Sequence, residues 1–406
     1  MKRNAVIDMT HGPLLGKILL FSLPLMASNI LQLLFNAADI VVVGRFTGHT
    51  ALAAVGSTGA LINLLINVFI GLSIGTNVLV ARYYGAQDAK QLSETVHTSV
   101  LTSLVSGVIL IVMGVAFAEP LLTLMGTPED VLGQAALYMR IYFVGMPAMM
   151  LYNFGAAILR SVGDTKRPLY FLLVASFLNI GLDLLCIIVF KMGVFGASFA
   201  TVFSQAVAGF GSLWYIARHY HELRWSKEEG KLSRDHCLKL CNMGIPMGLQ
   251  CSITAIGSVV LQGAVNGLGS DIVAAQTAGG KAAQFLCVPL ESIGTAMTTY
   301  ASQNMGAKDL DRVDRGVYTA LGIGCVYSIA SFLILRVTDK LLIGLFLDTS
   351  GVWCIGVPLA FLGALVWHLP IYGVYALVMS EEVYKLILGY IRYRQKKWLK
   401  NLAIQV

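Results

Sequence analysis

The chain contains two related segments, one in each half. The first includes Ile74-Gly75-Thr76 and Gly85-Ala86-Gln87-Asp88, and the second includes Ile293-Gly294-Thr295 and Gly306-Ala307-Lys308-Asp309. Each copy lies in long apolar sequence and follows a helix-interior proline, Pro24 or Pro246. Duplication of a helical bundle inside a membrane is typical of secondary transporters. The repeat therefore predicts two half-bundles around a central cleft.

Long apolar runs recur along the whole chain. Charged residues make up only 13% of the sequence, whereas a soluble domain carries about 25%. A run of about 20 apolar residues can cross the hydrocarbon core of a bilayer. The sequence predicts an all-α polytopic membrane protein with ten spans, at residues 14–43, 51–80, 93–117, 131–158, 168–190, 194–217, 238–265, 272–302, 315–337 and 352–379. Residues 1–13 lack a small-residue cleavage site, so we expect the first run to be retained and not removed as a signal peptide.

Positive charges gather in every second connection between the expected spans. One set of connections, which includes both termini, holds at least 22 lysines and arginines when the adjoining span ends are included, and the other set holds four. Lysine and arginine are enriched on the cytoplasmic side of membrane proteins, so both termini are expected in the cytoplasm. The net charge of +7 therefore reflects topology. We expect no nucleic-acid partner, because the sequence leaves no aqueous domain for one.

The most hydrophilic stretch, residues 218–236, separates the two repeat copies. We expect a six-helix N-terminal lobe at residues 1–217, a cytoplasmic linker at 218–237, a C-terminal lobe of about four helices at 238–379, and an amphipathic basic cytoplasmic tail at 380–406. The histidines and cysteines in and beside the linker match no standard zinc spacing, so no metal site is expected there.

The second half is shorter than the first. Glu119-Pro120 pairs with Asp339-Lys340 at an offset of 220, whereas Gly193-Val194 pairs with Gly351-Val352 at an offset of 158. The difference between these offsets is enough for two helices and a loop, which have no counterpart between Leu342 and Gly351. The expected architecture is two pseudo-symmetric half-bundles of six and four helices.

Two acidic residues lie inside expected spans. Asp39 is in the first span and Asp183 in the fifth, where Asn179 precedes it by one helical turn on the same face. An intramembrane carboxylate normally faces a cavity or an ion path. Oxygen ligands suit a hard cation, and carboxylates that share a site favour proton binding. Asp39 also lies close enough to Gly44 to be merely solvated near the outer interface.

Other polar and kinked positions give weaker signals. Asn153 and Thr201 could face the same cavity, although a threonine in a helix often bonds to the carbonyl one turn back. Glu291 and Lys281 could pair along one helix or face the cleft. Pro24 and Pro246 free backbone carbonyls and permit helix bending. No spacing of nucleophile and base points to an enzyme.

The residues now described resemble those of the MATE (multidrug and toxic compound extrusion) family. The resemblance rests on Pro24, Asp39, the segments 85–87, 160–168 and 193–197, the Asn179-x-x-x-Asp183 pair, Thr201, and Gln303-Asn304-Met305-Gly306-Ala307. It implies twelve helices in two six-helix lobes, so this chain departs from the family by two helices. It also implies that Asp39, Asn179 and Asp183 bind the coupling proton or sodium ion, with Asn153 and Thr201 as further polar positions of the lobe.

The expected function is a cation-coupled antiporter, driven by H⁺ or Na⁺, that exports amphipathic organic cations. We expect a monomer that spans a bacterial cytoplasmic membrane. No cofactor is expected besides the coupling ion, since the sequence has no Gly-x-x-x-x-Gly-Lys-Ser/Thr loop for a nucleotide. The alternatives are a flippase for lipid-linked substrates and a membrane remnant that no longer transports.

Overall fold

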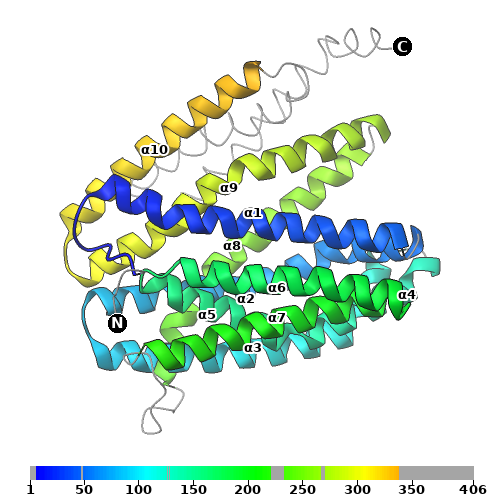
Figure 1. Ribbon diagram of the computed structural model, residues 1–406, viewed down its shortest axis with the longest axis horizontal. Coiled ribbons are helices and arrows are strands. Elements are labelled where there is room, and N and C mark those ends of the chain that lie inside the picture. The colour runs from blue at the N-terminus through cyan, green and yellow to red at the C-terminus, as the bar shows by residue number, and fades with distance from the viewer. Residues whose placement is uncertain are drawn as a thin grey trace. The chain divides into compact units, whose positions relative to one another are not determined.

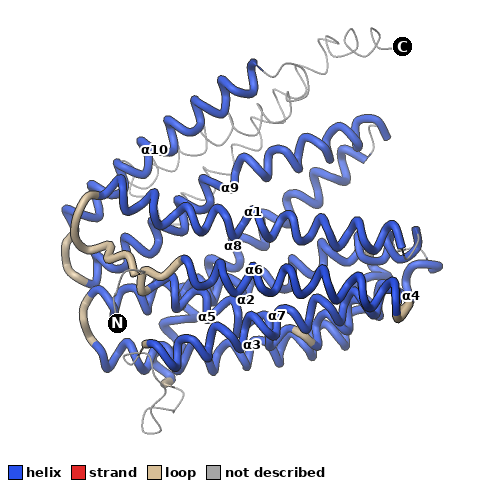
Figure 2. The backbone as a smooth tube through the Cα atoms, in the orientation of Figure 1, coloured by secondary structure: helices blue, strands red, loops and turns tan. Residues whose placement is uncertain are grey.

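The structure is a computed structural model that describes residues 6–46, 49–125, 127, 129–220, 233–266 and 270–337. These residues form helices joined by short turns, with no strand among them (Figures 1 and 2). The helices are α1 (Leu14–Phe46), α2 (His49–Gly85), α3 (Ala89–Leu124), α4 (Glu129–Val144), α5 (Met146–Ser161), α6 (Lys166–Asp183), the π-helix η1 (Leu184–Val189), α7 (Gly193–His219), α8 (Arg234–Asn266), α9 (Ser270–Gly306) and α10 (Leu310–Val337). The all-α prediction is confirmed.

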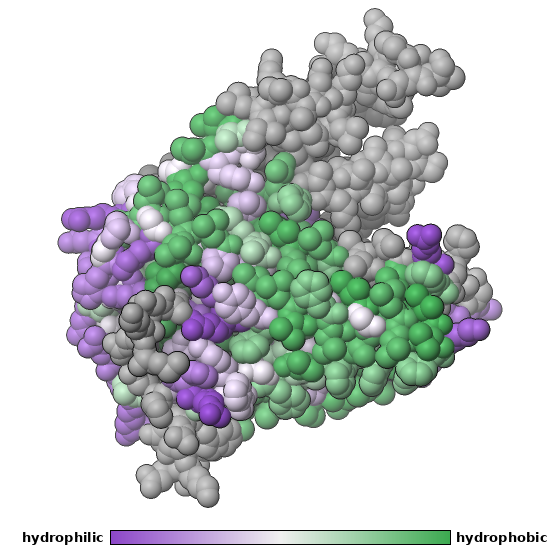
Figure 3. Space-filling model, in the orientation of Figure 1, coloured by the Kyte–Doolittle hydropathy of each residue, from purple (hydrophilic) through white to green (hydrophobic). Residues whose placement is uncertain are grey.

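Nine of the ten predicted spans correspond to these helices. The tenth span, the predicted tail and the position of the two absent helices lie outside the described residues. Within the described part of the chain, five helices are long and apolar enough to cross a membrane, or six if the bent pair α4–α5 is one span. Figure 3 shows hydrophobic residues over the middle of one face and hydrophilic residues gathered toward its ends. This banding suits a chain that crosses a bilayer.

The predicted fourth span is not one helix. It breaks at Gly145 into α4 and α5, which are bent by 49°. Pro147 lies in the first turn of α5, where its missing N–H costs little but where it cannot continue α4. A Cβ at Gly145 would lie 2.3 Å from a methyl of Val202, so the glycine also permits close packing against α7.

The predicted fifth span also changes its winding. α6 ends at Asp183, and the chain continues as the π-helix η1. A π-turn widens the helix and shifts the register of the side chains that follow, and such turns are frequent at functional sites. Asp183 therefore lies at a junction that the apolar pattern of residues 168–190 did not reveal.

The repeated motif has the same backbone form in both copies. Gln87 and its counterpart Lys308 both adopt positive φ, at 57° and 61°. The following aspartates both cap the next helix: Asp88 accepts from the backbone N–H of Gln91 at 3.1 Å, and Asp309 accepts from that of Arg312 at 3.0 Å. The internal repeat is thus confirmed at this turn.

The described chain belongs to two compact units. The first comprises Met1–Gln262 and Glu291–Ala320, and the second comprises Gly263–Leu290 and Leu321–Val406. All contacts discussed below lie within the first unit. The lobe boundaries expected from the sequence stay a prediction.

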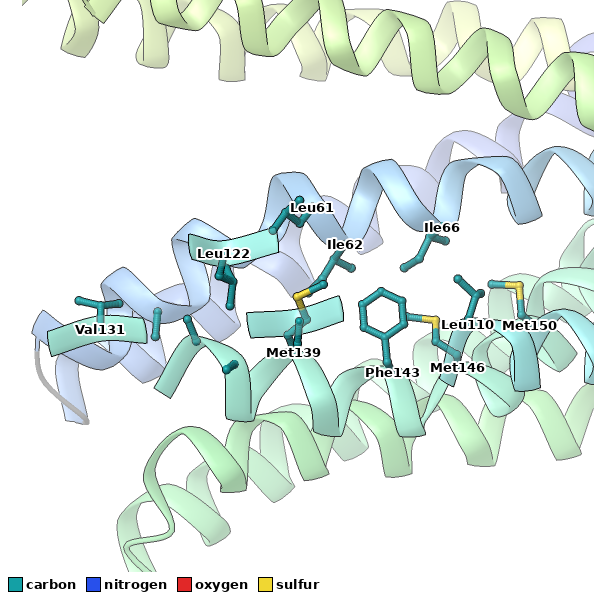
Figure 4. Close-up of a cluster of buried hydrophobic side chains, with 14 of the residues drawn as sticks. Leu61, Ile62, Ile66, Leu110, Leu122, Val131, Met139, Phe143, Met146 and Met150 are labelled. Atoms are coloured by element: carbon teal, nitrogen blue, oxygen red, sulfur yellow. The ribbon is translucent and has the colours of Figure 1, made fainter. Parts of the chain in front are cut away.

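The largest buried cluster of the first unit joins α2, α3, α4 and α5 (Figure 4). Phe143 projects from α4 toward Ile66 and Met146 and is fully buried. A Cβ at Gly114 would lie 1.9 Å from the Phe143 ring, so the glycine of α3 provides the space for this ring. Between membrane helices such close packing supplies much of the cohesion, because lipid is as apolar as the side chains. Two helices of this core, α4 and α5, also contact α7, which together with α6 carries the candidate site.

Candidate functional site

A buried polar cluster lies where α6 packs against α7. Asn179 is fully buried on α6, and its amide donates to the hydroxyl of Thr201 on α7 at 3.4 Å. The Thr201 hydroxyl donates in turn to the backbone carbonyl of Ala197 at 3.0 Å. The expected hydrogen bond from Thr201 to the carbonyl one turn back is therefore present. It orients the hydroxyl oxygen toward Asn179.

Asp183 lies one helical turn beyond Asn179. It is 1% exposed, and it is the last residue of α6 before the π-helix begins. The i, i+4 spacing places it on the face of Asn179, as predicted from the sequence. A carboxylate buried at this depth is expensive in a membrane and normally has a functional role.

Asp39 lies in α1, in a stretch whose side chains fall outside the described part of the structure. The neighbouring backbone places this part of α1 close to the cluster. Val42, one turn after Asp39, packs against the hydrophobic cluster formed by Ile187 of η1 with Val194 and Ala197 of α7. The prediction that the carboxylates of Asp39 and Asp183 share one cavity stays a prediction.

Asn153 is positioned differently from the other predicted residues. Its amide bonds back to the carbonyl of Met149 on its own helix at 3.0 Å. Among the described residues, no hydrogen bond joins it to Asn179, Asp183 or Thr201. Its part in ion binding stays a prediction.

Two further polar residues, which the sequence did not single out, extend the buried face. Ser176 lies one turn before Asn179 and is 3% exposed, and Gln205 lies one turn after Thr201 and is 8% exposed. The side-chain oxygens of Gln205 and Asn179 have no hydrogen-bond partner among the described residues. Helical spacing from Asn179 and Thr201 is the signal that could have identified both positions.

The cluster consists of oxygen-bearing side chains that are buried on the packed helices α6 and α7. It combines one carboxylate, two amide oxygens without partners among the described residues and one hydroxyl. Such a set can take up a proton at the carboxylate or hold a hard cation by oxygen ligands. No cluster of three metal-binding side chains of the histidine, cysteine or acidic type occurs in the described residues.

The two predicted bending prolines lie inside long helices, Pro24 in α1 and Pro246 in α8. The hydroxyl of Ser28 donates to the carbonyl of Pro24 at 2.9 Å. Ser28, one turn after the proline, thus gives the carbonyl of Pro24 a hydrogen-bond donor. Bending at these two positions stays a prediction.

The fold and site define a duplicated helical membrane protein with a buried polar cluster in its first half. A protein-family model, MatE, matches residues 24–185 and 246–393. These segments cover most of the chain, so the chain belongs to the MATE family, whose members are multi-pass membrane transporters. The predicted membership is confirmed.

Known proteins agree with this family assignment. "Probable multidrug resistance protein YoeA" of Bacillus subtilis is 31% identical over 335 residues, which are 81% of this chain and 72% of that protein. An "FAD transporter" of Shewanella oneidensis is 28% identical over 321 residues, which are 77% and 70%. A solved outward-facing multidrug resistance MATE transporter matches with a TM-score of 0.79 and 21% identity, covering 98% of this chain and all of that one. The two-lobed transporter fold is therefore shown.

Proposed function

We propose that the chain is a cation-coupled exporter of amphipathic organic cations, driven by H⁺ or Na⁺, in a bacterial cytoplasmic membrane. The observation that carries the proposal is the buried cluster of Asn179, Thr201 and Asp183. The chain has no nucleotide-binding loop in its sequence, so an ion gradient has to supply the energy. Relatives named for multidrug resistance support the substrate class.

The cluster supplies the coupling by differential binding. A proton or Na⁺ that neutralises Asp183 removes the cost of a buried charge, so loaded and empty states favour different arrangements of α1, α6 and α7. A ligand shifts such an equilibrium only by its difference in affinity for the two states. Release of the cation on one side and substrate on the other then completes an exchange cycle.

The charge pattern supports an orientation with both termini in the cytoplasm. Residues 45–50 and 266–271 are then extracellular, and single cysteines there should react with an impermeant thiol reagent from outside whole cells. Labelling of either segment only from the cytoplasm would overturn this topology. We further propose that the chain acts as a monomer and has no enzymatic activity.

A second substrate class comes from one relative. The FAD transporter of Shewanella oneidensis makes a flavin dinucleotide the runner-up to organic cations. The two classes differ in charge, so both belong in the same assay. Proteoliposomes loaded with ethidium or with FAD distinguish them.

The test compares the wild-type chain with Asp183→Asn and a matched control, Asp311→Asn, which changes an exposed aspartate at the start of α10. Ion-driven ethidium movement that Asp183→Asn abolishes and Asp311→Asn leaves intact supports the proposal. FAD movement with the same pattern favours the runner-up. Unchanged transport by Asp183→Asn would show that the cluster does not couple the ion to export.

A further inference from the structure

The segment before α1 is folded. In residues 7–12, here called the N-terminal strap, the Asp8 carboxylate accepts from the backbone N–H of Thr10 at 2.8 Å and from its hydroxyl at 2.6 Å. The Lys17 ammonium donates to the carbonyls of Asp8 and His11 and ties the strap to the first turns of α1. Partial burial raises the pKa of the Asp8 carboxyl, but the hydrogen bonds from Thr10 and His11 and the charge of Lys17 together bring this pKa below its ordinary value. The strap is thus a defined element and not a loose end.

The strap is bound to α9 and α10, two helices that lie far from it in the sequence. The N–H of Met9 donates to the side-chain oxygen of Gln303 at 3.3 Å. The carbonyl of Met9 accepts from the Asn304 amide at 3.2 Å and from Arg312 Nε at 3.3 Å, and Arg312 also donates to the carbonyl of Gly12 at 3.0 Å. The Met9 side chain is fully buried in a hydrophobic cluster that includes Ala296 and Tyr300 of α9.

The same strap is bound to the turn between α5 and α6. The N–H of Ile7 donates to the carbonyl of Gly163 at 3.0 Å. Gly163 has φ of +95°, and a Cβ there would lie 2.3 Å from the Ile7 carbonyl oxygen, so glycine is needed for this contact. The Gln303 amide donates to the carbonyl of Ser161 at 2.6 Å. Gln303 therefore joins the strap, α5 and α9.

Under the strap, the repeated turns of the two halves cross. A Cβ at Gly85 would lie 2.0 Å from the carbonyl oxygen of Gln303, and a Cβ at Gly306 would lie 1.9 Å from that of Arg82. In the repeat, Gly85 corresponds to Gly306 and Arg82 corresponds to Gln303. The glycine of each copy therefore contacts the same position of the other copy, as a two-fold axis requires. Further along the same helices, the Thr299 hydroxyl donates to Asn77 at 3.0 Å. The ends of α2 and α9 thus meet backbone to backbone.

Figure 1 shows the strap, in dark blue, beside the turn between α9 and α10. We propose that the strap is a removable seal over this crossing. It is bound through Gln303, Asn304 and Arg312 when this end of the molecule is closed, and it is released when the two halves part there. The proposal rests on the proposed transport function, because alternating access opens each end in turn. A contact that joins helices of both repeat copies, as Gln303 to Ser161 does, has to break on opening.

The test measures the accessibility of one buried position under the seal. Ser161 is fully buried, so Ser161→Cys in a chain without its native cysteines reports opening through its rate of reaction with N-ethylmaleimide. Gln303→Ala removes two hydrogen bonds of the seal and should raise this rate about tenfold, which corresponds to a loss of about 1.4 kcal/mol of closed-state stability. Gln134→Ala, which changes an exposed glutamine of α4, should leave it unchanged.

A second reporter separates opening from unfolding. Ser103 is fully buried on α3, and Ser103→Cys should react slowly in every variant. Arg312→Ala, in a more exposed position, should raise the Ser161→Cys rate by a smaller factor. An unchanged rate in both variants, or an equal rise at Ser103, would overturn the proposal. The assay uses purified protein without substrate, so a chain that fails to export still answers it, and absent export alone counts only against the proposed function.

Discussion

The amide of Asn179 donates to the hydroxyl of Thr201 across 3.4 Å, and this contact joins α6 to α7 inside the predicted membrane region. Thr201 is held in turn by its bond to the carbonyl of Ala197. In hydrocarbon no water competes for such groups, so a buried polar contact fixes the register of the two helices. Asp183, one turn along α6, is thereby held at a defined height beside α7.

Thr201→Val should weaken this helix pair. Valine keeps the branched shape but removes the acceptor, so the buried Asn179 amide loses its partner at a cost of about 1–3 kcal/mol. Thermal unfolding in detergent should show a lower midpoint for Thr201→Val and a nearly unchanged one for Thr201→Ser. Equal midpoints for both variants would show that the contact contributes nothing.

Gly85→Ala and Gly294→Ala should have opposite effects. The alanine methyl at position 85 meets the Gln303 carbonyl at 2.0 Å, whereas no atom lies within 4 Å of the corresponding point at Gly294. Gly85→Ala should therefore separate α2 from α9 and lower the thermal midpoint. Gly294→Ala, within α9, should raise stability by up to about 1 kcal/mol through helix propensity. A stable, tightly sealed Gly85→Ala protein would contradict the described crossing.

His236, at the start of α8, should make stability depend on pH. Burial lowers the pKa of His236 below its ordinary value of 6.5, with the nearby Lys239 ammonium acting the same way and Glu94 and Asp235 opposing. The neutral ring fits between Ser233 and Gln91, its nitrogens 2.9 and 3.0 Å from their side-chain oxygens.

The sign follows from the lowered pKa. The unfolded chain binds the proton more readily, so stability is fully present above about pH 6.5, the ordinary histidine pKa, and is lost as pH falls through the lower folded pKa. The thermal midpoint should drop between pH 7.5 and pH 5.5 in the wild type and drop less in His236→Gln. An equal drop in both proteins would assign the effect to other groups.

The shortened second half should limit turnover more than ion binding. Alternating access needs two comparable bundles, and polar backbone left open to lipid costs several kcal/mol for each group. Cells that express the 406-residue chain should gain little resistance to cationic dyes. Insertion of two helices between Leu347 and Gly351 should confer it. Strong efflux by the unmodified chain would show that the missing helices are dispensable.

Periodicity and helical spacing were enough to predict most of the helices and the shared helix face of Asn179 and Asp183, because both depend on neighbours within one or two turns. The bend at Gly145 and the π-turn after Asp183 lay inside apolar runs that also suit straight helices. Gly145 forms a bend because Pro147 follows it and because Val202, on another helix, fills the space where a side chain would project.

The strap could not be predicted from residues 1–13, which read only as short and polar. Its partners, Gln303 and Arg312, lie near the other end of the described chain, and no local pattern specifies such contacts. The hydrogen bond from the Asn153 amide to the carbonyl of Met149 shows the same limit for a residue inside a predicted span. The sequence places the Asn153 amide inside a span. Whether this amide bonds to its own helix or to the polar cluster depends on packing between helices.

Cation binding by the purified chain tests the proposed site most directly, because it does not require transport. Proton release on Na⁺ addition, followed with a pH indicator, together with Na⁺ titration by calorimetry, gives the ion and its stoichiometry. The wild type should bind about one cation per chain, as expected for one intramembrane acidic cluster. Asp183→Asn should lose this binding, and Asp311→Asn should keep it. Binding of the same amount and affinity by Asp183→Asn would contradict the assignment of the coupling ion to the cluster of Asn179, Thr201 and Asp183.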